Sequence, residues 1–332
     1  MLKIGLFGVG HLGKIHSRLI LELSSTYNFV GFFDPNEENA LNAEKEFGLT
    51  RYDSISTLIN EVDCIDIVTP TLSHFEIARE AILKGVHVFV EKPITHTVSE
   101  AKELTELADQ NTVTVQVGHV ERFNPAFSNA IPYFNQPRFI ESHRLAQYNP
   151  RGTDVPVVLD LMIHDIDIVL SVVKSPVKRI SASGVAVVSE TPDITNARLE
   201  FENGCVANLT ASRISMKNMR KSRFFQKDAY ISVDFLEKKT EIVKLTTLNT
   251  EPDPYDIVLD LGENKAKKKI EIFTPKIDSV NAIKSELSTF ADAITNSSTP
   301  IVTITDGYLA LKIAHLIMDD VSKNLNLIRE NN

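Results

Sequence analysis

Short apolar runs alternate with helical hydrophobic patterns along the first 120 residues of the chain. Residues 3–8 form a run of the length of a buried strand, and apolar residues then recur at the three- and four-residue spacing of a helix face. The alternation continues, with strands expected at 29–33, 64–68, 86–90 and 112–117 and helices at 37–47 and 74–84. Strands that are apolar throughout and separated by helices predict an α/β domain, a doubly wound parallel sheet with helices on both faces.

Helix boundary signals support these assignments. Ser73 precedes Glu76 at the spacing of a capping box, and Gly85 follows the end of the same helix. Thr97 and Glu100 predict a second capping box at the start of the next helix. The first half of the chain is therefore defined by hydrophobic period and by capping residues together.

The pattern changes after residue 122. One long helix is followed by β-rich sequence with short turns such as Glu202–Gly204, which is typical of an α+β domain with a mainly antiparallel open sheet. Strands are expected at 179–188, 197–201, 205–211, 230–235, 240–245 and 269–273, and closing helices at 280–296 and 306–324. We predict two domains, residues 1–122 and 123–332. The open sheet face suggests a homodimer or homotetramer.

Composition and charge narrow the class of protein. At 332 residues the chain exceeds the size at which a single core usually keeps growing, which agrees with two domains. The net charge of −9 argues against nucleic acid or an anionic membrane as a partner. No apolar stretch approaches the ~20 residues of a membrane helix, and the first residues lead directly into a strand. Cys64 and Cys205 lie in apolar runs, as expected of reduced thiols in the cytoplasm.

A glycine-rich turn follows the first expected strand. Gly8, Gly10 and Gly13 have the Gly-x-Gly-x-x-Gly spacing, and Asp34 ends the second strand 21 residues after Gly13. This context predicts a Rossmann domain in which a helix N-terminus faces a pyrophosphate and Asp34 binds ribose hydroxyls, which favours NAD over NADP. A glycine-rich turn beside an acidic loop residue is the alternative. The expected cofactor-binding residues are Gly8, Gly10, His11, Leu12, Gly13, Asp34, Thr69, Pro70, His74, Glu91 and Lys92.

Glu91, Lys92 and Pro93 follow the strand expected at 86–90. Ligands bind at the carboxyl ends of the strands of a doubly wound sheet, so Lys92 lies at the edge where chemistry is expected. An ammonium group there can hold a substrate hydroxyl close to the nicotinamide, while Pro93 fixes the chain direction. A surface turn without a catalytic role is the alternative interpretation.

Asp160 and His164 lie in an apolar stretch, residues 155–173, that predicts a helix. Their i, i+4 spacing puts both side chains on one helical face, where the carboxylate can orient the imidazole and stabilise its charged form. Such an imidazole suits removal of a hydroxyl proton during hydride transfer. Polar residues that only cap the helix or face solvent are the alternative. Asp165 and Asp167 lie close in sequence, but His164 and Asp165 point to different helix faces, so we expect no metal site.

The segments GVGHLG, EKP, GHVERFNP (residues 118–125) and DLMIHDID together resemble the Gfo/Idh/MocA family of oxidoreductases, over essentially the whole chain. In that family the lysine of EKP and the aspartate and histidine of a D-x-x-x-H motif form the catalytic set, with the histidine as acid/base. The resemblance implies these roles for Lys92, Asp160 and His164, in an NAD-dependent dehydrogenase that acts on a sugar CH–OH group. A regulatory protein that senses NAD without turnover is the alternative of another class.

Within this family, residues 141–145, 151–154, 157–165 and 196–213 resemble the UDP-N-acetylglucosamine 3-dehydrogenases. The resemblance implies oxidation of the 3-hydroxyl of this UDP-sugar to a ketone. A partner sugar aminotransferase would then convert the ketone to an amine for lipid A synthesis. A dehydrogenase of a free polyol or sugar, such as inositol, is the alternative.

A basic segment, residues 213–227, agrees with a nucleotide-sugar substrate. It holds six basic residues and no acidic one: Arg213, Lys217, Arg220, Lys221, Arg223 and Lys227. These side chains can bind a diphosphate, or they can protect an exposed strand edge or face another subunit. Arg122 and Asn124 are candidates for sugar or diphosphate contacts, or else form a domain-linking turn. The expected substrate-binding residues are Lys92, Arg122, Asn124, Arg151, Asp160, His164 and Arg213.

Overall fold

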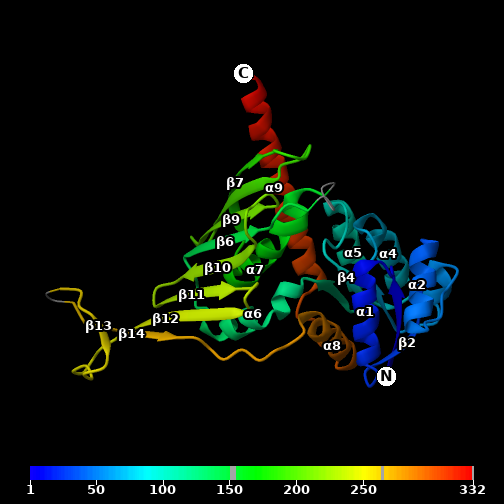
Figure 1. The fold of residues 1–332 in the computed structure, drawn as a ribbon, viewed down its shortest axis with the longest axis horizontal. Coiled ribbons are helices and arrows are strands. Elements are labelled where there is room, and N and C mark those ends of the chain that lie inside the picture. Colours follow the sequence, from blue (N-terminus) through cyan, green and yellow to red (C-terminus); the bar gives the residue numbers. More distant parts are fainter. Residues whose placement is uncertain (150–154, 263–264, 331–332) are drawn as a thin grey trace. The chain divides into compact units, whose positions relative to one another are not determined.

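The chain folds into two compact units in a computed structural model that describes residues 1–149, 155–262 and 265–330 (Figure 1). The first unit comprises Met1–Phe123 and Val280–Ile313, and the second comprises Asn124–Ser279 and Ala314–Asn332. Each unit has its own sheet. Within the described residues, no helix is both long enough and apolar enough to cross a membrane.

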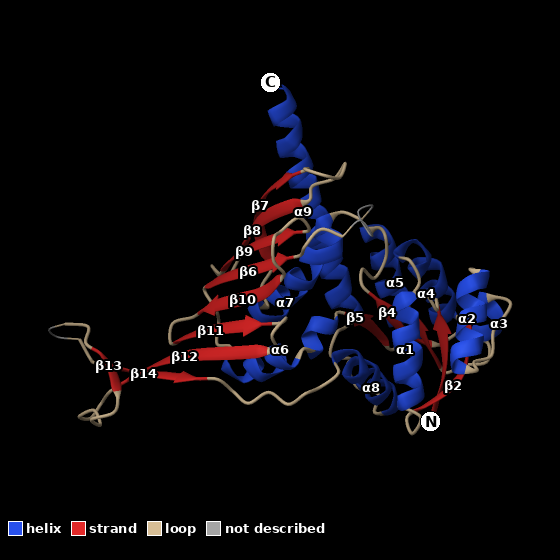
Figure 2. Ribbon diagram, viewed as in Figure 1, coloured by secondary structure: helices blue, strands red, loops and turns tan. Residues whose placement is uncertain are grey.

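The first unit is built on a parallel sheet of five strands in the order β2-β1-β3-β4-β5 (Figure 2). The strands are β1 (Leu2–Phe7), β2 (Tyr27–Phe33), β3 (Cys64–Ile67), β4 (His87–Glu91) and β5 (Val115–Gly118). The helices are α1 (His11–Glu22), α2 (Glu37–Phe47), α3 (Ile55–Ile59), α4 (His74–Leu83), α5 (Val98–Asn111) and α8 (Ala282–Thr295), with short turns η1 (Thr71–Ser73) and η2 (Val120–Phe123). The predicted doubly wound parallel sheet is confirmed.

Helix α8 belongs to the first unit, although the hydrophobic pattern assigned it to the second domain. Its Leu287 and Phe290 are fully buried in one core cluster with Ile4 and Phe89 of the sheet. The Phe89 and Phe290 rings meet edge to face with centroids 5.9 Å apart. Helix α8 therefore covers part of the first sheet although it is remote in sequence. A single boundary at residue 122 does not separate the two units, because α8 packs with the residues before that boundary.

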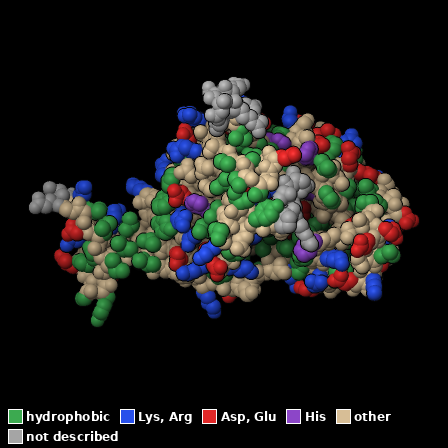
Figure 3. All heavy atoms as spheres, turned by 45° about the horizontal axis from the view of Figure 1, so that its top comes forward, with side chains coloured by type: hydrophobic (Ala, Val, Ile, Leu, Met, Phe, Trp, Pro, Cys, Tyr) green, Lys and Arg blue, Asp and Glu red, His purple; other side chains and the backbone are tan. Residues whose placement is uncertain are grey.

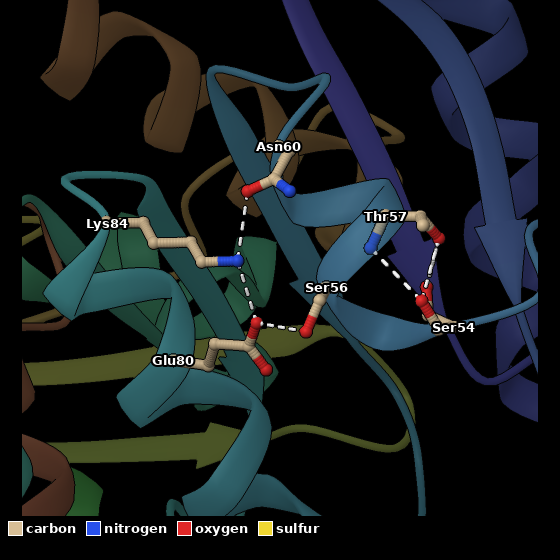
Figure 4. A network of polar contacts seen from close by, with 6 residues as sticks. All are labelled: Ser54, Ser56, Thr57, Asn60, Glu80 and Lys84. Atoms are coloured by element: carbon tan, nitrogen blue, oxygen red, sulfur yellow. Dashed lines mark hydrogen bonds and ion pairs between the residues drawn. The ribbon is translucent and has the colours of Figure 1, made fainter.

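A polar network ties α3 to α4 (Figure 4). Glu80 accepts hydrogen bonds from Ser56 Oγ at 2.6 Å and Lys84 Nζ at 2.8 Å, and Lys84 also donates to Asn60 at 2.9 Å. The bonds from Lys84 and Ser56 lower the pKa of the Glu80 carboxyl. Ser54 caps α3, a five-residue helix too short to show a hydrophobic period, so the pattern did not predict it.

One of the two predicted capping boxes forms. Thr97 and Glu100 make both reciprocal bonds at the start of α5. Ser73 makes no side-chain cap bond to α4, so that prediction was wrong. Its backbone angles, φ −96° and ψ −10°, are those of the short turn η1 that leads into the helix, whereas an N-cap side chain needs an extended backbone to reach back.

The second unit contains a mixed, mostly antiparallel sheet in the order β13-β14-β12-β11-β10-β6-β9-β8-β7 (Figure 1). Its strands are β6 (Phe139–Leu145), β7 (Val177–Val185), β8 (Ile194–Phe201), β9 (Val206–Ser212), β10 (Met219–Phe225), β11 (Ala229–Asp234), β12 (Lys239–Thr247), β13 (Ile257–Leu259) and β14 (Lys268–Phe273). Its helical elements are α6 (Pro125–Ala130), η3 (Ile131–Tyr133), η4 (Val158–Met162) and α7 (Ile163–Val173), and α9 (Ile304–Glu330) continues into it from the first unit. The predicted α+β class is confirmed, with β6 and β9 as a parallel pair.

A buried ion pair fixes α7 on the sheet. Arg144 of β6 donates from Nε and Nη2 to the two carboxylate oxygens of Asp165, at 2.9 and 3.1 Å. Both side chains are almost fully buried. A forked arginine–carboxylate pair fixes orientation as well as distance. It therefore holds the helix that carries His164 in one register against β6.

Candidate functional site

A cavity of about 680 Å³ lies in the first unit at the carboxyl ends of β1, β2 and β3. This is the edge where ligands bind to doubly wound sheets. Seven of the predicted cofactor-binding residues line it: Gly8, Gly10, His11, Leu12, Asp34, Thr69 and Pro70. Further lining comes from Phe33, Val68 and Ile77, which give it apolar walls. The mixture of apolar walls and a glycine turn suits a dinucleotide.

Glycine is needed at each of the three positions of the turn for a different physical reason. Gly8 has φ +90°, a conformation that residues with a side chain rarely adopt. A Cβ on Gly13 would lie 2.1 Å from the Gly8 carbonyl oxygen, so only glycine lets α1 begin this close to β1. Beyond its chain neighbours, a Cβ on Gly10 would come closest to Asn39 Nδ2, at 3.9 Å, so Gly10 leaves open space toward the cavity. These are the three roles that the spacing predicts for a pyrophosphate cradle.

Asp34 links the glycine turn to the second strand. Its Oδ2 accepts a hydrogen bond from the Val9 backbone N–H at 2.8 Å, and its Oδ1 accepts one from the Asn36 N–H at 2.8 Å. Each carboxylate oxygen keeps a second lone pair for a ligand hydroxyl. Asp34 is therefore fixed in place and lines the cavity as an acceptor, as NAD recognition requires.

Asp34→Ala is expected to lower the ratio of kcat/KM with NAD to that with NADP at least about tenfold, because it removes the acceptors for ribose hydroxyls and the charge that repels a 2′-phosphate. Steady-state rates with both cofactors measure this ratio. Asp63→Ala is the matched control, since Asp63 accepts a 2.8 Å bond from the Lys3 N–H at the opposite end of the same sheet. An unchanged ratio in Asp34→Ala would remove this role.

Sequence reasoning missed eight residues that line this cavity: Phe33, Pro35, Asn36, Asn39, Ile55, Val68, Ser73 and Ile77. Asn36 caps α2 by accepting from the Asn39 N–H at 2.9 Å. The signal was present, since an asparagine before two glutamates marks a helix start. Ile55 belongs to the short helix α3, which the pattern did not predict.

Gly13, His74, Glu91 and Lys92 were predicted to bind the cofactor, but they are absent from the residues that line this cavity. The buried His74 bridges two loops: its Nδ1 lies 2.9 Å from the Pro93 carbonyl oxygen and its Nε2 lies 2.9 Å from that of Thr69. Burial lowers the pKa of His74, and the two carbonyl contacts oppose that shift. His74 thus connects the loop after β3 to the residues that follow Lys92.

Four ionisable side chains meet inside the first unit, under the carboxyl ends of β3 and β4. We call His16, Asp66, Glu91 and Glu286 the buried ionisable cluster. His16 Nδ1 lies 2.8 Å from Asp66 Oδ2, and His16 Nε2 lies 3.4 Å from Glu91 Oε1. Burial disfavours the imidazolium, but the Asp66 and Glu91 carboxylates outweigh it and raise the pKa of His16 well above its usual value.

Glu286 of α8 completes this cluster. It is fully buried, and neither carboxyl oxygen has a hydrogen-bond partner among the described residues. Burial, together with the nearby charge of Glu91, raises the pKa of Glu286 well above its usual value. Both effects favour the protonated form of Glu286, which adds no negative charge next to Asp66 and Glu91.

Glu286→Gln is expected to flatten the pH dependence of stability. Because the raised pKa lets the folded state keep a proton that the unfolded state releases above about pH 4.5, the free energy of unfolding falls as pH rises through the folded pKa, by at most about 1.4 kcal/mol per pH unit. The variant lacks this loss, so its stability relative to the unmodified protein should increase from pH 5 to pH 8. Urea unfolding at both pH values measures it. The exposed Glu103→Gln is the control, and parallel curves for Glu286→Gln would contradict a protonated Glu286.

Asp160 and His164 lie in the second unit, on successive turns of one helical segment. The predicted helix at 155–173 begins instead at Val158, with one π-helical turn before α7. Such turns occur frequently at functional sites, because the wider turn displaces side chains from regular α-helical positions. Both side chains are half-buried. Lys92, in the first unit, is also half-buried, and its peptide bond to Pro93 is cis.

Two of the predicted substrate-binding residues are occupied by protein contacts. Asn124 caps α6 by accepting from the Ala126 N–H at 3.1 Å, and it donates to the Phe235 carbonyl at 3.0 Å. The buried Arg213 donates to the Val155 carbonyl and lies beside Asp193. Their role in substrate binding stays a prediction.

The remaining basic candidates are dispersed. Arg122 lies 3.6 Å from Asp306 within the first unit, and Arg151 lies outside the described residues. β10, within the basic segment, is paired with β6 on one side and β11 on the other, so the alternative that this segment protects a strand edge is wrong. Lys221 and Arg223 alternate along β10 with the buried Ser222 and Phe224. These two basic side chains therefore project to the face of the sheet opposite to the buried pair.

Comparison with known proteins agrees with both units. Residues 2–119 match the model of an oxidoreductase family with an NAD-binding Rossmann fold, and residues 126–228 match the GFO/IDH/MocA C-terminal domain. A UDP-N-acetylglucosamine 3-dehydrogenase from Acidithiobacillus ferrooxidans is 36% identical over 301 residues, which cover 88% of this chain and 92% of that protein. A solved structure of that dehydrogenase superposes with a TM-score of 0.85 at 31% identity, covering 96% of this chain and 97% of the other.

A second relative has a different named substrate. The NAD⁺-dependent scyllo-inositol 2-dehydrogenase of Bacillus subtilis is 24% identical over 330 residues, covering 94% of this chain and 91% of that protein. The glycine cradle, Asp34 and both matched domains identify NAD as the cofactor and the protein as a dehydrogenase. The chain belongs to the Gfo/Idh/MocA family of NAD-binding oxidoreductases.

Proposed function

We propose that this dehydrogenase oxidises the 3-hydroxyl of UDP-N-acetylglucosamine to a 3-keto sugar. The observation that carries the proposal is the 36% identity to a protein of that name, over 88% of this chain and 92% of the relative. The 24% identity to the scyllo-inositol enzyme makes a free cyclitol the second candidate. Bound NAD would accept the hydride.

His164, Lys92 and Asp160 are the residues to which we assign the chemistry. Loss of a hydride from a carbinol carbon requires loss of the hydroxyl proton, and an imidazole is suited to accept it near neutral pH. Asp160, four residues before His164, would hold the imidazole in its productive tautomer and stabilise its charged form. The Lys92 ammonium would donate a hydrogen bond to the sugar hydroxyl.

We further propose that a sugar aminotransferase consumes the ketone and yields an amino-sugar for lipid A. A ketone next to an N-acetyl group is a suitable acceptor for an amino group, and its removal would draw an unfavourable oxidation forward. Two buried free thiols, Cys64 and Cys205, suit a reducing compartment, which supports the cytoplasm as the location.

We also propose that the protein assembles as a homodimer or homotetramer through the sheet face of the second unit that α6 and α7 leave open. Phe139, Phe225 and Tyr230 form a row of aromatic contacts across three strands, with centroids 5.6 and 5.1 Å apart. At the end of this sheet the hairpin around β13 exposes Tyr255 and Ile257, at 98% and 56%. Apolar side chains gather at this end of the second unit, at the left of Figure 3. Exposed apolar patches are typical of interfaces. Light scattering that returned a 37 kDa species would contradict assembly.

Following NADH absorbance during incubation with NAD and each candidate substrate tests the activity. UDP-N-acetylglucosamine, with and without glutamate and a sugar aminotransferase, is compared with scyllo-inositol. We expect NADH only with the nucleotide sugar, and more of it when the aminotransferase removes the ketone. Turnover of the inositol alone would overturn the substrate assignment. NADH from neither, although NAD binds, would favour an NAD sensor.

A further inference from the structure

The residues around Glu91 and Lys92 place the buried ionisable cluster directly behind the EKP segment. Glu91 is the last residue of β4, and its Oε2 accepts a hydrogen bond from the backbone N–H of Lys92 at 3.2 Å. Its other oxygen faces His16 Nε2 at 3.4 Å. The Glu91 carboxylate therefore lies between a buried histidine of α1 and the backbone of the residue to which we assign substrate binding.

The opposite side of the Glu91 carboxyl group is closed by Gly118 of β5. A Cβ at position 118 would lie 2.8 Å from the Glu91 carboxyl carbon and 2.9 Å from each of its oxygens. The carboxylate is thus enclosed by α1 on one side and by the β5 backbone on the other. A side chain held this way has one available position, provided that His16 keeps its own.

Asp66 holds His16 in its position. His16 and Asp66 are both fully buried, and their 2.8 Å contact fixes the orientation of the imidazole ring. Phe89, with its ring centroid 6.0 Å from that of His16, packs beside it. Apolar residues of similar volume would fill this space without the cost of burying charges. Only the ionisable set supplies an ion pair between His16 and the Glu91 carboxylate, which accepts a hydrogen bond from the Lys92 backbone.

We propose that His16 is a positioning residue for the reaction: oriented by Asp66, it holds the Glu91 carboxylate that fixes the backbone of Lys92. This inference rests on the proposed role of Lys92. His16 lies outside the residues that line the cofactor cavity, so its loss should affect turnover and leave NAD affinity unchanged. A displacement of about 1 Å in a substrate-positioning group is enough to lower a rate by roughly 10²-fold.

Two substitutions of His16 separate positioning from packing. The asparagine amide of His16→Asn occupies the place of Nδ1 and keeps a donor toward Asp66, but it has none toward Glu91. The longer His16→Gln places its amide near Nε2 and keeps the donor toward Glu91. Both remove the imidazole ring and leave space in the core, so a general loss of packing would affect them alike. Gly118→Ala presses on the Glu91 carboxyl from the other side and provides an independent variant.

The measurements are kcat with the substrate that the unmodified enzyme turns over, the Kd of NAD, and the rate at which acetic anhydride labels Lys92 relative to the exposed Lys102. We expect His16→Asn and Gly118→Ala to lower kcat roughly 10- to 100-fold with NAD Kd within about threefold, and His16→Gln to restore most of kcat. The labelling ratio should change in the first two variants and stay near the unmodified value in His16→Gln. His87→Gln, at the other end of β4, is the control and should change none of the three quantities.

Equal kcat values for His16→Asn and His16→Gln, or a loss of NAD affinity that parallels the loss of kcat, would overturn the positioning role. The labelling ratio needs no substrate. If the unmodified enzyme turns over neither candidate substrate, the proposed function fails, while an unchanged Lys92 ratio in His16→Asn would refute the inference by itself.

Discussion

Replacing His164 by alanine is expected to lower kcat roughly 10³-fold, because the variant has no side chain to accept the hydroxyl proton, a contribution of about 10²- to 10⁴-fold in acid–base catalysis. The ion pair between Arg144 and Asp165 holds the helix independently of the imidazole. The fold and the Kd of NAD should therefore change little. Single-turnover rates of NADH formation, together with NAD titration, measure the two effects separately.

Added imidazole provides the sharper test of His164. It should restore part of the lost rate in His164→Ala, with a dependence on pH that follows the free-base form of imidazole. His143→Ala is the matched control, since His143 lies on β6 beside Arg144 but projects to the opposite face of the sheet, and it should leave kcat unchanged. Retained activity in His164→Ala would remove His164 as the base.

The first sheet could be predicted because its signals are local. Strands buried on both faces are apolar throughout, and a glycine turn between a strand and a helix has few other uses. The lack of such local signals explains why strand β6 of the second unit was not predicted. β6 alternates buried and half-buried residues and carries Glu141, His143 and Arg144, and its place in the sheet is decided by partners remote in sequence.

Polar residues were harder to interpret than apolar ones. Asn124 and Arg213, which we expect to bind substrate, also have structural partners: the first caps a helix and the second bonds to a carbonyl from a remote segment. His16 and Glu286 were not selected at all, since a histidine and a glutamate on amphipathic helices usually face solvent. Only the packing of α1 and α8 on the sheet shows that both are buried together. Sequence spacing thus locates a cofactor cradle better than it locates ionisable residues that act through tertiary contacts.

Gly13→Ala and Gly10→Ala should separate the two demands on the glycine turn. At position 13 the new Cβ would lie 2.1 Å from a backbone oxygen, so β1 and α1 must move apart. We expect a loss of roughly 2–4 kcal/mol in the free energy of unfolding, despite alanine's better helix propensity, and weaker NAD binding with it. Gly10→Ala meets only open space in the protein, so its stability should change by less than about 1 kcal/mol.

The Kd of NAD should nevertheless rise about 100-fold in Gly10→Ala, because the methyl group occupies the place where the backbone approaches the pyrophosphate. Urea unfolding and NADH fluorescence titration, run on both variants, give the two quantities independently. Gly13→Ala unfolding at the same urea concentration as the unmodified protein would contradict the close approach of α1 to β1. Normal NAD affinity in Gly10→Ala would move the pyrophosphate away from this turn. The contrast between the two variants is the main test. If Gly13→Ala lowers the free energy of unfolding while Gly10→Ala raises the Kd of NAD at nearly unchanged stability, one common defect of the turn cannot explain both results.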